Sequence, residues 1–263
     1  MNIFDVIVLG VIQGITEFLP ISSSGHLVLG KSLLNVSTPG VSLEVWLHLG
    51  TLVAVMVYFR RRIITIIQAF PGFSRPDMRQ QDRTLLWALI VGTLPAVIIG
   101  LSFKRYIEEA FHSPHLVAAM LMVTGLFLIA TVAAEDRMKS VGIGRGLAIG
   151  VAQSIAILPG ISRSGSTMAC AMFLGVDPVL AAEFSFLLAI PAIGGAFLLD
   201  MISSEESLLG SGQFPFYLLG AAVSFAFGLL SIHYLLKVIR TGRFFLFGFY
   251  CLVIGLISLI FLP

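Results

Sequence analysis

Long apolar stretches follow one another along this chain and are separated by short polar segments. Six of them are roughly 18–23 residues long, the length that an α-helix needs to cross the hydrocarbon core of a bilayer. They predict transmembrane helices at residues 41–59, 85–103, 116–134, 178–200, 214–236 and 244–261. The chain is therefore expected to be an all-α, polytopic membrane protein.

Two further apolar stretches are interrupted by polar, glycine and proline residues. GVIQGITEFLPISSSG at residues 10–25 reappears as GVAQSIAILPGISRSG at 150–165, with eight of sixteen positions identical. Irregular backbone at membrane depth is tolerated only where protein or water satisfies its polar groups. Each copy is expected to form a re-entrant, broken-helix hairpin, over residues 3–35 and 147–176. An alternative interpretation makes residues 3–19 a complete span, since this stretch is just long enough.

The repeat predicts one transmembrane domain, residues 1–263, built of two units at residues 1–140 and 141–263. Each unit would hold one hairpin and three transmembrane helices. An odd number of crossings inverts the second unit relative to the first. Inverted-topology repeats with discontinuous helices build polar sites near the membrane midplane.

The composition supports a membrane protein, and the charges suggest its orientation. The chain is 57% hydrophobic and 11% charged, with a mean hydropathy of +1.01, whereas soluble domains carry about twice that charged fraction. Twelve of its sixteen basic residues follow spans one, three and five, namely Arg60, Arg61, Arg62, Arg75, Arg79, Arg83, Arg137, Lys139, Arg145, Lys237, Arg240 and Arg243. The segment 201–213 has Glu205 and Glu206 and no base. The positive-inside rule then opens the first hairpin to the outer face and the second to the inner face.

The N-terminus and the cysteines add little to this interpretation. The start, MNIFD, has no basic residue and no small-residue cleavage site, which argues against a cleaved signal peptide. Cys170 and Cys251 stand in apolar sequence without the spacing of a metal site or redox pair, so both are expected to be buried. No nucleic-acid partner is expected.

A polar stripe marks the first broken stretch. Gln13 and Glu17 stand four residues apart and share one face of an otherwise apolar helix. A carboxylate within a membrane segment is energetically unfavourable and usually marks a functional site. The alternative is a Glu near the outer surface that simply meets water.

Both breaks also carry the serine-rich start of a second helix. Serine is a preferred N-cap, and the free amides at a helix N-terminus attract phosphate. The residues concerned are Ser22, Ser23, Ser24 and Gly25 in the first copy and Ser162, Arg163, Ser164, Gly165 and Thr167 in the second. The planar guanidinium of Arg163 suits phosphate oxygens. Its alternative role is a structural ion pair with Glu17 or Glu183.

Two histidines are candidates for proton transfer. His26 follows Ser23 by three residues, and imidazole titrates near neutral pH; the alternative is a structural histidine. Glu44 and His48 share a helix face at the start of the first span, and Glu183 lies in the matching region of the second unit. A direct role and a supporting role stay open for these three.

Ser23, His26, Glu17 and Arg163 together offer a nucleophile, a proton carrier, a carboxylate and an anion clamp. Phosphoryl transfer needs little more than positioning and charge neutralisation, usually with a divalent cation. Glu17 and Gln13 are the predicted oxygen ligands for that cation. Whether Ser23 or a metal-bound water attacks stays open. An intramembrane phosphate site suits a substrate with a phosphorylated head and a long apolar tail.

At these residues the chain resembles the undecaprenyl-diphosphate phosphatases of the bacitracin-resistance (BacA/UppP) family. The family's first motif, Glu or Gln followed by xxxE, occurs as QGITE at residues 13–17, and FLPxSSxGH follows as FLPISSSGH at 18–26. Its second signature, PGxSRSxxT, stands as PGISRSGST at 159–167, and FSFLLAIP occurs at 184–191. The resemblance covers the whole chain.

The resemblance implies hydrolysis of undecaprenyl diphosphate to undecaprenyl phosphate and inorganic phosphate, which recycles the lipid carrier of cell-wall synthesis. It implies a divalent cation, Mg²⁺ or Ca²⁺, a site on the outer side of the bacterial inner membrane, and a homodimer as one known state. By position, Ser23 corresponds to the nucleophile, His26 to the proton-transfer residue and Glu17 to a catalytic or metal-binding acid. The corresponding phosphate-binding set is Arg163, Ser162 and Thr167, to which the serine-rich breaks add Ser22, Ser24, Gly25, Ser164 and Gly165.

Two rival functions share part of this pattern. A polyprenyl-phosphate transporter or flippase could use the same midplane anion site, and it would need Arg163 but no serine–histidine pair. Type 2 phosphatidic-acid phosphatases share an SGH element, found here within SSSGH. They also need a KxxxxxxRP element, which is absent from this sequence, and a His and an Asp at fixed distances after an SR pair, which Ser162 and Arg163 lack.

Overall fold

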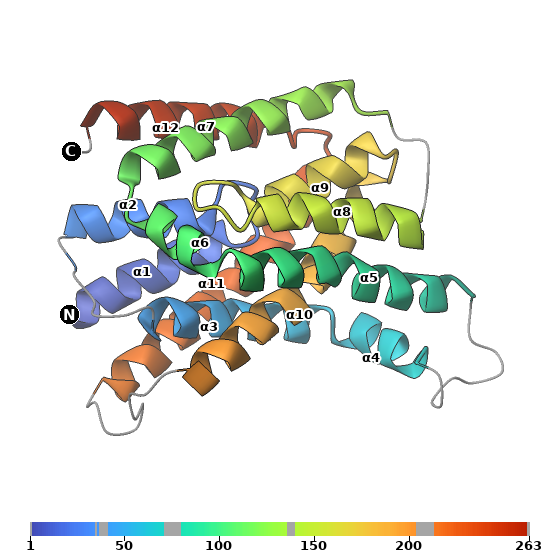
Figure 1. Cartoon of the computed structure of the whole chain (residues 1–263), viewed down its shortest axis with the longest axis horizontal. Coiled ribbons are helices and arrows are strands. Elements are labelled where there is room, and N and C mark those ends of the chain that lie inside the picture. Colours follow the sequence, from blue (N-terminus) through green and yellow to red (C-terminus); the bar gives the residue numbers. More distant parts are fainter. Residues whose placement is uncertain are drawn as a thin grey trace.

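The structure, a computed structural model, describes residues 2–34, 36, 42–70, 80–135, 140–203 and 213–261. Its elements are the helices α1 (Ile3–Thr16), α2 (Ser23–Leu34), α3 (Ser42–Tyr58), α4 (Arg60–Gln68), α5 (Gln80–Ser102), α6 (Lys104–Phe111), α7 (Pro114–Ala130), η1 (Thr131–Ala133), α8 (Ile143–Ile155), α9 (Arg163–Phe173), α10 (Pro178–Ser203), α11 (Phe214–Ile239) and α12 (Leu246–Phe261). Most of them lie side by side along the long axis, and both termini lie at the same end of it (Figure 1). The predicted all-α class is confirmed.

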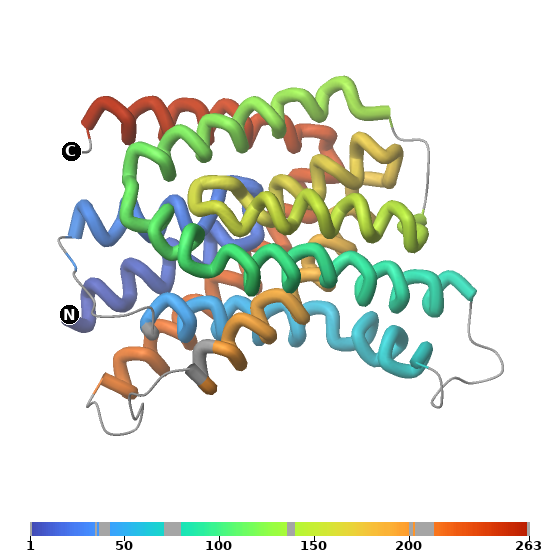
Figure 2. The backbone as a smooth tube through the Cα atoms, in the orientation of Figure 1, coloured from blue at the N-terminus to red at the C-terminus, as the bar shows by residue number. Residues whose placement is uncertain are grey.

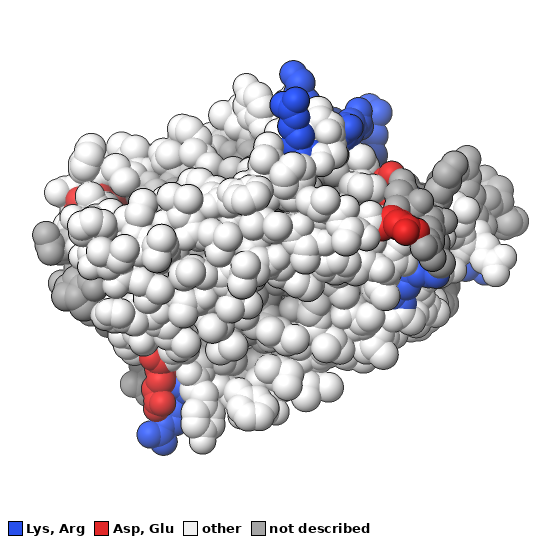
Figure 3. Space-filling view, turned by 90° about the horizontal axis from the view of Figure 1, so that it is seen from above, with Lys and Arg blue, Asp and Glu red and all other residues white. Residues whose placement is uncertain are grey.

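Helices occupy all six predicted spans, as α3, α5, α7, α10, α11 and α12. Of the helices described, α5, α7 with η1, α10 and α11 are long and apolar enough to cross a membrane, while α1, α3 and α12 are shorter apolar helices. Ile98, Leu126 and Leu230 are each more than half exposed. The charged side chains visible in Figure 3 leave a broad uncharged surface between them. Such a surface suits lipid, so the chain is a polytopic membrane protein.

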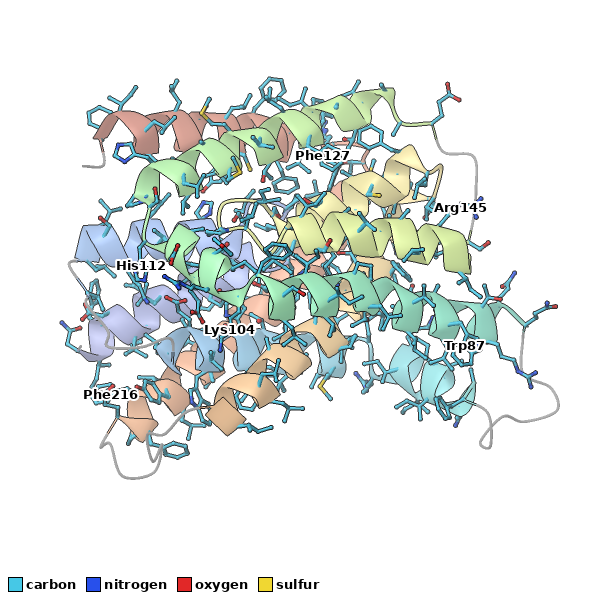
Figure 4. All side chains as sticks on the ribbon, viewed as in Figure 1. Trp87, Lys104, His112, Phe127, Arg145 and Phe216 are labelled. Atoms are coloured by element: carbon cyan, nitrogen blue, oxygen red, sulfur yellow. The ribbon has the colours of Figure 1, made fainter. Side chains whose placement is uncertain are left out.

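Two charged connections contain short helices that the hydrophobic pattern did not predict. In α4, Arg60 and Arg61 are exposed while Ile66 is buried. In α6, Ala110 is buried and Glu108 is exposed. A short helix with apolar residues on one side and charges on the other is stable at a membrane surface. A search for long apolar stretches does not detect such a helix. In Figure 4, Lys104 and His112, near the two ends of α6, lie toward the opposite end of the molecule from Arg145.

Both broken stretches form a helix, a break and a second helix. α1 ends at Thr16 and packs against α2, and α8 likewise packs against α9. The tube in Figure 2 turns back at both breaks inside the molecule. α1 therefore ends before residue 19 and the chain returns alongside it; that this hairpin is re-entrant in the membrane stays a prediction.

Small residues hold the helix pairs close together. A Cβ built on Gly150 of α8 would lie 2.1 Å from the carbonyl oxygen of Gly92 in α5, and one on Gly50 of α3 would lie 2.1 Å from that of Ala221 in α11. No side chain fits at such distances, so glycine lets these backbones touch, as is common between membrane helices. α1 packs on α11, while α8 packs on α5. Each hairpin thus packs against a helix from the opposite half of the chain.

The largest cluster of buried apolar side chains includes residues of the first break. Phe18, directly after Glu17, is fully buried and meets Phe186 of α10 edge to face, with ring centroids 5.3 Å apart. Ser231 Oγ of α11 donates a 2.8 Å hydrogen bond to the carbonyl oxygen of Ile15. Buried backbone groups need such partners, so packing and hydrogen bonding together hold the first break in place.

Some charged residues used in the orientation argument lie outside the described residues. They are Arg75, Arg79, Arg137, Lys139, Glu205 and Glu206.

Candidate active site

The two helix breaks meet in the interior. Ser164 Oγ, at the start of α9, donates a 3.1 Å hydrogen bond to the carbonyl oxygen of Leu19 in the first break. A Cβ on Gly165 would lie 3.2 Å from Cβ of Pro20. Gly165 therefore allows the two turns to pack directly against each other, which brings together segments 145 residues apart in the sequence.

Glu17 lies at the centre of this contact. Its Oε2 accepts hydrogen bonds from Gln13 Nε2 at 2.9 Å and from Ser23 Oγ at 2.5 Å. Its Oε1 accepts a hydrogen bond from Nη2 of Arg163. His48 Nε2 of α3 lies 3.6 Å from Oε2. Side chains from both hairpins and from α3 thus converge on one carboxylate.

The ion pair between Glu17 and Arg163 is almost completely enclosed. The Glu17 side chain is 5% exposed and that of Arg163 is 15% exposed. Ionised groups are retained in such surroundings only when they are paired and hydrogen-bonded. The alternative partner, Glu183, instead accepts a 2.7 Å hydrogen bond from Nε of Arg62 in α4. Arg163 is therefore bound to the acid of the opposite hairpin.

The serines of the first break have different environments. Ser22 has a φ of +66°, a left-handed conformation that residues other than glycine rarely adopt. Its Oγ accepts a 3.3 Å hydrogen bond from the amide of Gly25 and lies 3.3 Å from Oγ of Ser24. Ser23 instead points its Oγ at Glu17. Ser22 thus shapes the turn, and Ser23 is the hydroxyl placed beside a base.

The second break is fixed by a residue that the sequence analysis did not identify. Ser162 is the N-cap of α9, and its Oγ accepts a 3.0 Å hydrogen bond from the amide of Gly165. Thr124 of α7 accepts from the amide of Ser162 at 3.0 Å and donates to the carbonyl oxygen of Gly160 at 3.0 Å. A threonine within an apolar span gives no motif, although a buried hydroxyl at membrane depth calls for a partner.

Ser185 of α10 is a second residue that was missed. Its Oγ lies 2.6 Å from Oγ1 of Thr167, and its carbonyl oxygen accepts a 3.4 Å hydrogen bond from Nη1 of Arg163. The FSFLLAIP segment contains Ser185 as its one polar residue, which is the signal that could have revealed it. The carbonyl oxygen of Ser185 thus contacts the guanidinium of Arg163. The hydroxyl of Thr167 already has Ser185 as a hydrogen-bond partner.

His26 does not join the cluster around Glu17 in the contacts described. Its Nδ1 lies 2.9 Å from the carbonyl oxygen of Ser22, and its Nε2 lies 2.8 Å from the hydroxyl of Tyr250 in α12. The imidazole and phenol rings are stacked, with an interplanar angle of 8°. His26 follows Ser23 by three residues, but its imidazole contacts Ser22 and Tyr250, whereas Ser23 Oγ contacts Glu17.

The sequence left the role of His48 open, and the structure places this side chain beside Glu17. Its Nδ1 lies 2.7 Å from the carbonyl oxygen of Glu44, and only the ring nitrogen can donate in that bond. The other ring nitrogen, Nε2, is the one that faces Glu17. The side chain of Glu44 pairs with Lys31 of α2, so Glu44 supports the site from outside while His48 lines it.

The oxygen donors needed for a divalent cation are present around Glu17. Among the described residues no three His, Cys, Asp or Glu side chains are grouped to hold a metal ion. Gln13 Oε1, however, is buried and has no hydrogen-bond partner, and Gln13 already touches Glu17. One carboxylate and an amide oxygen, completed by water and substrate phosphate, are a usual Mg²⁺ environment. Gln13 and Glu17 therefore fit the predicted cation.

The model of one protein family matches residues 6–257, and its description is "Bacitracin resistance protein BacA". The chain belongs to the BacA family. A family member from Desulforapulum autotrophicum, named undecaprenyl-diphosphatase, is 41% identical over 99% of this chain and 98% of its own length. Another of that name from Syntrophotalea carbinolica is 43% identical over 97% of each chain, and one from Korarchaeum cryptofilum is 39% identical over 97% of this chain and 98% of its own.

The BacA match spans both hairpins and all the helices that line the site. The resemblance found from the motifs is thus confirmed over nearly the full length. Of the residues singled out by those motifs, the structure brings Gln13, Glu17, Ser23 and Arg163 into one cluster. His26 contacts Tyr250 instead of this cluster. The structure adds His48 beside Glu17 and Ser185 beside Arg163.

Proposed function

We propose that this protein is an integral membrane undecaprenyl-diphosphatase, which hydrolyses undecaprenyl diphosphate to undecaprenyl phosphate and inorganic phosphate. The observation that carries the proposal is the cluster in which Ser23 donates to Glu17 while Arg163 binds the same carboxylate. The relatives named undecaprenyl-diphosphatase, matched over nearly their whole length, support the same activity. Release of undecaprenyl phosphate would return the lipid carrier to cell-wall synthesis.

The cluster supplies the groups that phosphoryl transfer needs. Glu17 is placed to accept the Ser23 proton as Oγ attacks the terminal phosphorus and undecaprenyl phosphate leaves; water would then hydrolyse the phosphoserine and release inorganic phosphate. Where water attacks instead, Ser23 and Glu17 orient it. In both cases Arg163 offers its fork to the phosphoryl oxygens, where charge builds up in the transition state. Binding of substrate phosphate would replace Glu17 as the partner of Arg163.

A divalent cation, Mg²⁺ or Ca²⁺, belongs to the proposal. Gln13 and Glu17 would hold it, since Gln13 Oε1 has no partner and the amide nitrogen of the same side chain donates to the carboxylate. When bound, it would neutralise charge on the diphosphate. The hydroxyls at the two breaks, of Ser22, Ser24, Ser162, Ser164 and Thr167, and the backbone at Gly25 and Gly165 complete the proposed phosphate-binding set.

The architecture proposed for this site is an inverted-topology repeat with two re-entrant hairpins. The breaks at Glu17 and Ser162 lie inside the molecule, and each hairpin packs on a helix of the other half. The basic segments would face the cytoplasm, which places the opening of the first hairpin on the outer side of a bacterial inner membrane. A homodimer, and the division into units 1–140 and 141–263, stay predictions.

A transporter or flippase is the less favoured function. It would use Arg163 to bind an anion but has no need for a serine hydroxyl held 2.5 Å from a carboxylate. The relatives named undecaprenyl-diphosphatase also support a hydrolase. Binding of the lipid without release of phosphate would reverse this preference.

Phosphate release from undecaprenyl diphosphate by the purified protein in detergent tests the proposal. We expect release that EDTA abolishes and that Mg²⁺ or Ca²⁺ restores. Ser23→Ala is expected to lower the rate by about 10²–10⁴-fold, the range found for a proton-transfer or nucleophile contact.

Ser224→Ala is a matched control for this variant, because it removes a buried hydroxyl that donates to the carbonyl oxygen of Leu47 and not to Glu17. It should keep the activity of the unmodified protein. A folded protein that binds the lipid but releases no phosphate would refute the phosphatase. Full activity in Ser23→Ala would exclude Ser23 as nucleophile or essential contact.

His26→Ala is expected to lower kcat with a smaller effect on KM. The imidazole lies at the edge of the cluster, so its loss should remove proton transfer and leave the phosphate contacts of Arg163 in place. Steady-state kinetics across substrate concentrations measure both constants. A loss confined to KM would instead make His26 a substrate ligand.

A further inference from the structure

The contacts of His26 determine which ring nitrogen carries the hydrogen. The carbonyl oxygen of Ser22 can only accept, so Nδ1, 2.9 Å away, is the protonated nitrogen. Nε2 then has a lone pair in the neutral ring, and the Tyr250 hydroxyl at 2.8 Å is the donor that fills it. Both nitrogens thus have a partner, one from the first hairpin and one from α12.

The two partners also determine the ring's orientation. Ser22 presents its carbonyl oxygen from a left-handed backbone with φ of +66°, so this acceptor is part of a constrained turn. The phenol ring of Tyr250 lies parallel to the imidazole within 8°, with centroids 5.6 Å apart. The next residue, Cys251, donates through Sγ to the carbonyl oxygen of Pro20 at 3.7 Å. α12 therefore contacts the first hairpin through two successive residues.

We propose that Tyr250 is a positioning residue that holds His26 in a single tautomer and orientation at the edge of the active site. Tyr250 stands 224 residues from His26 and belongs to the other half of the chain, so α12 would complete a site that the two hairpins alone leave unfinished. The inference rests on the proposed function, in which His26 transfers a proton. A general acid or base needs a defined tautomer and a fixed direction.

Tyr234 gives the matched comparison. It too contacts a histidine, His233, but edge to face at 77° rather than stacked. This pair lies on α11, and Tyr234 is 60% exposed, whereas Tyr250 is 41% exposed. Tyr234→Phe therefore removes a tyrosine hydroxyl beside a histidine without touching the hairpins.

The first test is a kinetic double-mutant cycle on phosphate release. Tyr250→Phe is expected to lower kcat about tenfold while KM changes by about twofold or less, which is the effect of one hydrogen bond used in the rate step. In the His26→Ala background, Tyr250→Phe should cause no further loss. Tyr234→Phe should match the unmodified protein. Unchanged kcat in Tyr250→Phe, or a full additional loss in the double variant, would overturn the proposal.

The second test does not depend on activity. Protein labelled with ¹⁵N-histidine has five imidazole rings with two nitrogens each, and His26→Ala identifies the two signals of His26. We expect the signals of a neutral ring protonated at Nδ1, with the Nε2 signal shifted as that of a hydrogen-bond acceptor. This pattern should be lost in Tyr250→Phe and kept in Tyr234→Phe. Identical His26 signals in Tyr250→Phe would refute the positioning role. A protein that releases no phosphate would refute the proposed function, and this measurement would still decide the role of Tyr250.

Discussion

Arg163→Ala is expected to lower phosphate release from undecaprenyl diphosphate by about 10³-fold or more and to weaken substrate binding. Arginines that stabilise a transferred phosphoryl group contribute factors of this size. Arg163 joins the second hairpin to Glu17 of the first, and it is the positive group at the centre of the cluster. Steady-state kinetics and lipid binding by the detergent-solubilised variant measure the two effects.

The variant also leaves Glu17 buried without its counterion, so stability must be followed separately. Arg62→Ala is the control, because Arg62 also forms interhelical ion pairs, with Asp82 and Glu183, and neither pair includes Glu17. Both variants should unfold at lower temperature: breaking the buried Glu17–Arg163 pair costs about 3–5 kcal/mol, and loss of the more exposed Arg62 pairs costs less. Only Arg163→Ala should lose turnover. Near-normal turnover in a folded Arg163→Ala protein would remove its role as the phosphate clamp.

Glu17→Gln is expected to lower turnover by about 10²–10⁴-fold and to remove the response to Mg²⁺ or Ca²⁺ as well. The amide keeps the size of the side chain but can neither take the Ser23 proton nor balance the charge of Arg163. In the unmodified protein, added cation should raise the unfolding temperature by mass action. In Glu17→Gln that increase should disappear.

Glu183→Gln is the control for this change. Glu183 is also a partly buried acid paired with an arginine, but its partner is Arg62 and it has no contact with Ser23 in the structure described. Its substitution should preserve turnover and the stabilisation by cation. A Glu17→Gln protein that still hydrolyses the lipid and still responds to Mg²⁺ would exclude Glu17 both as base and as metal ligand.

The helices were predictable because each span is a local property. An unbroken apolar stretch of sufficient length has one stable state in lipid, and all six predicted spans became helices. The two breaks were predictable as well, since Pro20 and Pro159 stand beside clusters of glycine and serine that interrupt the apolar pattern. The short helices α4 and α6 were missed because their stability depends on an interface, which hydropathy along the chain does not represent.

The site was predictable to the extent that its residues are carried by the repeated motif. Gln13, Glu17, Ser23 and Arg163 were all named from it, and the structure joins them. The sequence did not predict which residue of the second half lies beside His26. Ser23 and His26 lie on nearly the same side of α2, and only the packing of α12 decides that the imidazole contacts Tyr250 while Ser23 Oγ contacts Glu17.

The sequence by itself determined the membrane class, the two broken hairpins, the family and the chemical groups of the site. These follow from run lengths, residue types and motifs that act over a few turns of helix. Only the tertiary structure decided that Arg163 pairs with Glu17 rather than Glu183, and that His48, Ser185 and Tyr250 complete the surroundings. Such contacts join residues up to 224 positions apart. Their partners are selected by how glycine-lined helices pack, and no local pattern in the chain encodes that choice.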